Sequence, residues 1–117
     1  LCIATDSAED IARRRPLSSH FPETVAYELA RYPAIRTITE ELASAGFDIH
    51  VDHVEFEYEL TDATPYRDRA FSSLHLISPE ALARGLARMD DDLARGPIPA
   101  LSLYTLVWGV KRADKRP

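Results

Sequence analysis

The hydrophobic pattern predicts three β-strands, one at each end of the chain and one near the middle. Residues 1–5 are apolar at nearly every position, as in a strand covered on both faces. From Val54 to Leu60 apolar and acidic residues alternate strictly, which is typical of a strand with one wet face. Residues 100–111 are apolar on both faces and are predicted to be buried. We therefore expect the last strand to insert between the other two.

The middle strand begins earlier, at Phe47, but its pattern shifts along its length. The apolar positions are odd-numbered at Phe47, Ile49 and Val51, and even-numbered from Val54 onward. One inserted residue would bring both sets to the same face of the sheet. The sequence therefore predicts a β-bulge at residues 52–53.

Helical patterns fill the segments between these strands, and proline or glycine marks their ends. Ser7 is predicted to cap the first helix, because its hydroxyl can accept from the amide of Asp10. The clearest helix ends at Gly46, after apolar residues recurring at helical spacing. The predicted helices cover residues 7–16, 22–33, 33–45 and 78–96.

The composition is that of a folded acidic domain. Hydrophobic residues make up 45% and charged residues 28% of the 117 positions, so one domain is the largest unit expected. A net charge of -5 gives no basic surface for nucleic acid. The sequence shows no signal peptide or long apolar span, so no membrane partner is expected. The single cysteine, Cys2, excludes a disulfide framework and predicts a buried thiol in a cytoplasmic protein.

Two acidic clusters have residue types that metal ions use. Glu55, Glu57 and Glu59 lie two apart on one strand, with side chains roughly 7 Å apart and no histidine converging on them. Residues 90–92 are aspartates inside a helical pattern, where calcium-loop geometry cannot form. Both clusters are predicted to be solvated surfaces, and no metal site is expected.

Three segments together resemble the C-terminal half of class I S-adenosylmethionine-dependent methyltransferases. They are Leu1-Cys2-Ile3-Ala4-Thr5-Asp6-Ser7, the helix end from Glu40-Glu41-Leu42 to Ala45-Gly46-Phe47, and the strand from Tyr104 to Lys111. In that family the fifth strand, a helix ending in "AGF", the sixth strand and an antiparallel seventh strand between them close the sheet. The resemblance implies an α/β fold: the C-terminal part of a Rossmann-like sheet of three strands, the last antiparallel and central. Residues 1–117 would then be a single partial domain, with an insertion at residues 61–96.

The resemblance does not extend to the cofactor site. The family binds S-adenosylmethionine with a glycine-rich loop after its first strand, and no GxGxG occurs among Gly46, Gly85, Gly96 and Gly109. It therefore implies the substrate-side portion of a methyltransferase, in which sequence before Leu1 binds the cofactor. The isolated chain is expected to be inactive and to bind no cofactor. The parent would methylate a small molecule, but neither this acceptor nor the methylated atom can be predicted.

Candidate site residues follow from the position of the crevice in open α/β sheets, at the carboxyl ends of the strands. Thr5 and Asp6 end the first strand and would border it. Arg13, Arg14 and Arg15 would meet an anionic substrate there, or else form a solvated helix face. His20 is the candidate catalytic base, with a packing histidine as the alternative.

An alternative function needs no catalysis. The chain would then be an α+β oligomerisation or interaction module that pairs strands with itself or a partner. On either hypothesis the strand at residues 1–5 presents an open apolar edge, so a homo-oligomer is expected.

Overall fold

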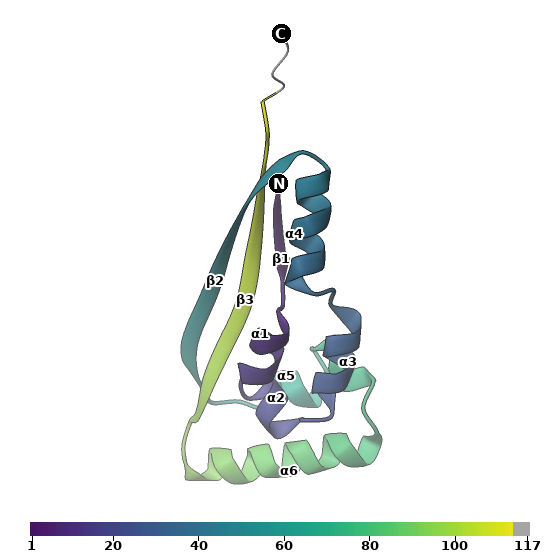
Figure 1. Cartoon of the computed structure of the whole chain (residues 1–117). Coiled ribbons are helices and arrows are strands. Elements are labelled where there is room, and N and C mark those ends of the chain that lie inside the picture. The colour runs from purple at the N-terminus through teal and green to yellow at the C-terminus, as the bar shows by residue number, and fades with distance from the viewer. Residues whose placement is uncertain (114–117) are drawn as a thin grey trace.

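The computed structural model describes residues 1–113 and places three strands in one sheet (Figure 1). They are β1 (Cys2–Thr5), β2 (Phe47–Leu60) and β3 (Ile98–Lys111), in the order β1-β3-β2. β3 is antiparallel to both neighbours, so β1 and β2 run in the same direction. The predicted α/β class, with the last strand central and antiparallel, is confirmed.

The helices begin and end close to the predicted positions. Ser7 forms a capping box with Asp10 at the start of α1, and Ser78 caps α6 through the amide of Ala81. Gly46 follows α4 with a φ of 95°, a backbone angle that favours glycine. The main helices are α1 (Ala8–Arg13), α3 (Thr24–Arg31), α4 (Ile35–Ser44) and α6 (Pro79–Arg95). The sequence did not predict the short helices α2 (Leu17–His20), α5 (Thr64–Arg67) and 3-10 helix η1 (Ser72–His75).

The prediction of a bulge at residues 52–53 is wrong. β2 pairs with β3 in unbroken register, from Phe47 opposite Lys111 to Leu60 opposite Ile98. The pattern shifts because different faces of this long hairpin are covered at its two ends. α4 packs against the first part of β2, whereas Leu60 packs against the core that contains α6, which crosses the far end of the sheet (Figure 1).

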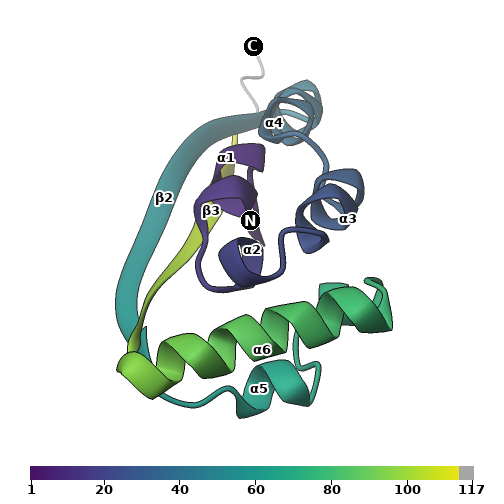
Figure 2. The ribbon, with the colours of Figure 1, turned by 90° about the horizontal axis from the view of Figure 1, so that it is seen from below.

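One face of the sheet, the covered face, packs against helices. Leu103, Thr105 and Val107 of β3 point to this face and are buried. The Thr105 hydroxyl donates a 2.6 Å hydrogen bond to Asp10 Oδ2, which ties α1 to the sheet. In Figure 2 the helices gather to one side of the β2–β3 hairpin.

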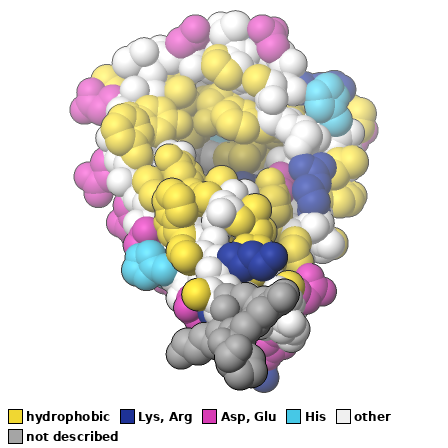
Figure 3. Space-filling view, turned by 90° about the horizontal axis from the view of Figure 1, so that it is seen from above, with side chains coloured by type: hydrophobic (Ala, Val, Ile, Leu, Met, Phe, Trp, Pro, Cys, Tyr) yellow, Lys and Arg dark blue, Asp and Glu magenta, His cyan; other side chains and the backbone are white. Residues whose placement is uncertain are grey.

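The other face of the sheet, the bare face, is exposed along β1 and much of β3. This corrects two predictions, because Trp108 is 40% and Val110 69% exposed and the Cys2 thiol is also exposed. No element among residues 1–113 covers these side chains, although the apolar pattern is that of a buried strand. Seen from above, the molecule has a hollow that hydrophobic side chains surround (Figure 3). The apolar side chains of the bare face are Cys2, Ala4, Val54, Phe56, Tyr104, Leu106, Trp108 and Val110, and the strand register places Asp48, His50 and Asp52 of β2 on the same face.

A hydrophobic core lies where α2, α5 and α6 meet the end of the sheet. Phe21 is fully buried, and its ring stacks on Tyr66 with centroids 5.9 Å apart. Gly85 lets α6 approach this ring, since a Cβ at that position would lie 2.2 Å from Phe21 Cδ1. Residues 61–96, predicted as an insertion, form α5, η1 and α6 and supply much of this core.

Candidate functional site

A cavity of ≈ 290 Å³ lies beyond the carboxyl end of β1. Its polar wall comes from Asp6, which follows β1, from Arg14 and Arg15 after α1, and from Glu28 of α3. Its remaining lining residues are Leu17, Tyr32, Tyr58, Tyr66, Phe71, Ser72, Leu101, Ser102, Leu103 and Tyr104. The segments before β2, the two strands β2 and β3, and the segment between them therefore meet around one space.

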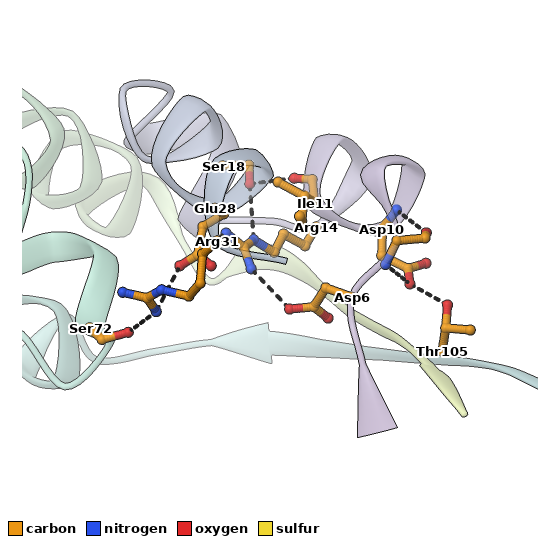
Figure 4. Close-up of polar contacts among 10 residues, drawn as sticks. Asp6, Asp10, Ile11, Arg14, Ser18, Glu28, Arg31, Ser72 and Thr105 are labelled. Atoms are coloured by element: carbon orange, nitrogen blue, oxygen red, sulfur yellow. Dashed lines mark hydrogen bonds and ion pairs between the residues drawn. The ribbon is translucent and has the colours of Figure 1, made fainter. Parts of the chain in front are cut away.

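Arg14 is the centre of the polar wall (Figure 4). Its Nε donates a 3.0 Å hydrogen bond to Ser18 Oγ, and that hydroxyl donates to the carbonyl oxygen of Ile11 at 2.6 Å. Its Nη1 lies 3.6 Å from Asp6 Oδ2, and its Nη2 lies 3.9 Å from Glu28 Oε1. The guanidinium is therefore fixed at one nitrogen and paired with two carboxylates by charge alone, because both distances exceed a hydrogen bond.

Glu28 is 5% exposed, which is unusual for a carboxylate. Arg31 Nη1 lies 4.0 Å from its Oε1 and also donates a hydrogen bond to Ser72 Oγ (Figure 4). Glu28 Oε2 and Arg14 Nη2 are both buried and have no hydrogen-bond partner among the described residues. The site thus holds an unpaired acceptor and an unpaired donor.

Burial shifts the protonation of two further lining residues. It is the main cause of the raised pKa of Asp6, while the Arg14 charge acts in the opposite direction. Burial also raises the pKa of Tyr66, and the nearby Tyr58 adds to the shift. Tyr66 therefore stays a neutral phenol at physiological pH.

Aromatic side chains form the apolar wall of the cavity. Tyr66 and Phe71 lie in contact, with ring centroids 5.1 Å apart at an interplanar angle of 32°. Tyr58 of β2 and Tyr104 of β3 line the sheet side. Such walls suit a flat ring, which can stack on or meet the edges of these side chains.

The structure brings together some of the predicted site residues. Asp6, Arg14 and Arg15 line the cavity. Thr5 is buried beside it and does not line it. Arg13 lies on the covered side of the sheet, where its Nη1 donates a 2.9 Å hydrogen bond to Glu55. Substrate binding by these residues stays a prediction.

His20 lies outside the cavity wall and joins α2 to α6. Its Nε2 is 2.7 Å from Asp92 Oδ2, and its Nδ1 is 3.2 Å from Ser19 Oγ. The side chain is buried, and this geometry is that of the packing alternative. Its role as a base stays a prediction.

Sequence reasoning missed Glu28 and the tyrosines of the wall. Glu28 follows Thr24 by one helical turn, and both side chains are buried on the same face of α3. The only sequence signal for Glu28 is its position four residues after Thr24, which places both on one face of a helix. That face could not be identified before the packing of α3 was known.

The described part of the chain has neither a metal-binding cluster nor a helix that could span a membrane. No group of three or more His, Cys, Asp or Glu side chains in residues 1–113 could hold a metal ion. Within the same residues, no helix has the length and apolar character needed to cross a membrane.

Comparison with known proteins gives no relative. No family model, curated protein or solved structure matches the chain.

Proposed function

We propose that this chain is the C-terminal, substrate-side portion of an S-adenosylmethionine-dependent methyltransferase that acts on a small molecule. The observation that carries the proposal is the sheet order β1-β3-β2, with an antiparallel last strand between two strands of common direction. This is the order that the resemblance implies for the closing strands of that family.

The position of the cavity supports the same proposal. Ligands of open α/β sheets bind beyond the carboxyl ends of the strands. The cavity lies there for β1, and Asp6 and Arg14 form part of its wall. Its size and aromatic lining suit a small organic acceptor rather than a macromolecule.

The glycines of this chain do not form a cofactor loop. Gly46 and Gly96 end helices, Gly85 accommodates Phe21, and Gly109 lies within β3 against Phe47. The proposal therefore assigns S-adenosylmethionine to sequence upstream of Leu1, and the methyl group comes from that cofactor. The proposal gives the residues that line the cavity the role of binding and orienting the methyl acceptor. Such positioning can supply much of the rate of a group-transfer enzyme.

The coding sequence upstream of Leu1 tests this proposal first. It should encode a strand followed by a glycine-rich loop of the GxGxG type. Calorimetric titration then separates the two parts: S-adenosylmethionine should bind the longer protein and give no saturable signal with the 117-residue chain. Micromolar binding by the short chain, or an upstream sequence without such a loop, would overturn the proposal.

The bare face favours a second candidate, a non-catalytic oligomerisation or interaction module. An exposed apolar surface of this kind often marks a protein contact. If the chain is such a module, the upstream sequence should lack a nucleotide-binding loop, and the longer protein should bind no S-adenosylmethionine.

A further inference from the structure

A hydrogen-bonded line of three side chains joins α2 to α6, outside the cavity wall. His20 Nε2 lies 2.7 Å from Asp92 Oδ2, and His20 Nδ1 lies 3.2 Å from Ser19 Oγ. A carboxylate, an imidazole and a hydroxyl in this order are the groups of nucleophilic serine catalysis, which is recognised by geometry and roles rather than by sequence position. The contacts that pack His20 between two helices are therefore also those that activate a serine.

The contact with Asp92 determines which nitrogen of the His20 ring carries the proton. A carboxylate only accepts hydrogen bonds, so the neutral ring places its N–H at Nε2. Nδ1 then keeps a lone pair and faces the Ser19 hydroxyl, toward which it is a base. The two nitrogens exchange the roles that they have in the common triad, and the path of the proton is the same.

The Ser19 hydroxyl has one competing acceptor, the carbonyl oxygen of Pro16, at 3.3 Å. That oxygen already accepts the amide N–H of His20 at 2.8 Å. His20 Nδ1 is nearer, at 3.2 Å, and has no second partner among the described residues. The hydroxyl proton of Ser19 is therefore assigned to the side of His20.

Burial and charge favour the transfer of that proton to His20. The His20 side chain is 6% exposed, and Asp92 would stabilise the imidazolium in a site largely closed to water. Arg88, one helical turn before Asp92, donates a 3.0 Å hydrogen bond to the carbonyl oxygen of Ser19. It thus places a positive charge near the serine, which favours developing negative charge there. Ser19 is partly exposed, so a small molecule approaches from the serine end of the line.

We propose that Ser19 is a nucleophile that accepts an acyl group from a small activated ester. Ser19 Oγ attacks the carbonyl carbon of the ester while its proton passes to His20 Nδ1. The bond from that carbon to the alcohol oxygen then breaks, the alcohol takes the proton from His20, and Ser19 keeps the acyl group as an ester. Asp92 is a positioning residue, because it acts through His20. This inference goes beyond the proposed function and does not depend on it.

The wild-type chain tests the reactivity of Ser19 against another serine of the same molecule. A fluorophosphonate probe forms a bond to an activated serine oxygen and releases fluoride, and peptide mass spectrometry measures the label at each serine. Ser19 should be labelled about a hundredfold faster than Ser44, because a positioned base gives at least that factor. Ser44 is exposed at the end of α4 and contacts no histidine among the described residues. Urea should abolish the difference, and 4-nitrophenyl acetate should acetylate Ser19.

Substitution of Ser19 and His20 tests the nucleophile and the base. Ser19→Ala should remove the label, and His20→Gln should lower the labelling rate to that of Ser44. In the wild type the rate should rise with pH and level off once His20 is neutral. His20→Gln should lose this plateau, because no imidazole remains to take the proton.

Substitution of Asp92 tests the positioning role. Asp92→Asn should lower the rate at least tenfold, on the order of the loss of a group that orients a base. It should also move the midpoint of the pH profile to lower pH, because the imidazolium loses its counter-charge. A structural role alone would lower the rate and leave the midpoint in place. Asp91→Asn, at the neighbouring exposed aspartate of α6, is the matched control and should change neither.

The wild-type comparison remains decisive even where His20→Gln fails to fold. Labelling of Ser19 no faster than that of Ser44, or equal labelling in the folded and the urea-unfolded chain, would overturn the inference. So would a folded His20→Gln variant that reacts as fast as the wild type, or a wild-type pH profile without a plateau. None of these measurements uses S-adenosylmethionine, so a failure here leaves the proposed function untouched, and the reverse also holds.

Discussion

Phe21 and Trp108 are both large aromatic residues, yet one is fully enclosed and the other lies on an open face. Phe21 stacks on Tyr66 and faces Gly85 in the core beneath the sheet. Trp108 is 40% exposed on the bare face, and its Nε1 donates a hydrogen bond to Asp52. Their hydrophobicity is similar, so the difference lies in what the described chain places against them. The apolar character of a residue therefore predicts a surface that favours burial, but it does not identify the element that would bury it.

Alanine substitution of these two aromatics should give the largest contrast. Phe21→Ala should cost about 3–5 kcal/mol, because it opens a cavity in a closed core. Trp108→Ala should cost only about 1–2 kcal/mol in the 117-residue chain, since part of its surface is already in water. Denaturant unfolding measures both losses of stability, from the shift of the midpoint at an unchanged m value. Equal losses would contradict the division into a closed core and a bare face.

Gly85 tests the same core from the neighbouring helix. Gly85→Ala places a Cβ where Phe21 already lies, so overpacking of about 1–3 kcal/mol should outweigh the gain of about 1 kcal/mol in helix propensity. Ala83→Gly, at an exposed position of α6, measures that propensity alone. Combining Gly85→Ala with Phe21→Leu should cost less than the sum of the two single changes. An increase in stability for Gly85→Ala would show that α2 and α6 are not in close contact.

Asp6 offers a smaller, electrostatic test at the cavity. Burial raises the pKa of Asp6 in the folded protein above its ordinary value, so the folded carboxyl takes up its proton at a higher pH than the unfolded one. Asp6 ionisation therefore opposes folding above the folded pKa, and this penalty disappears as the pH falls below the unfolded value. Because Arg14 lowers the pKa and Glu28 raises it, Arg14→Met should raise it further and Glu28→Gln should lower it. Carboxyl ¹³C NMR titrations measure these shifts, and a lower pKa in Arg14→Met would contradict the pairing.

Arg13 is expected to have the smallest effect. Its ion pair with Glu55 is solvent-exposed, so Arg13→Ala should change stability by less than about 1 kcal/mol. A loss clearly above about 1 kcal/mol, measured by denaturant unfolding, would contradict the solvent-exposed geometry of this ion pair.

Much of the fold was predictable because its signals are local. The capping box at Ser7, the helix end at Gly46 and the strand alternation after Val54 depend on residues close in sequence. The central place of β3 also followed from its apolar character on both faces. This prediction of topology was correct even though one face of β3 is exposed.

The remaining features depend on packing between distant elements. The shift of pattern in β2 reflects a change of covered face, which no local signal distinguishes from a bulge. Glu28 reaches the cavity only because α3 packs beside Arg14, from another helix. The sequence supplied Asp6 and Arg14 as candidates through their place after β1. It could not indicate which carboxylate from elsewhere would meet them.

Whether the bare face is a contact surface is tested most directly by light scattering combined with fluorescence of Trp108, the single tryptophan. Because β1 also has no strand on its outer side within residues 1–113, we expect a two-fold dimer of the chain at tens of micromolar. Trp108 should then become less accessible to acrylamide as concentration rises, and Cys2→Lys, on the same face, should restore the monomer. A monomeric mass throughout, with unchanged quenching of Trp108, would contradict this role for the bare face.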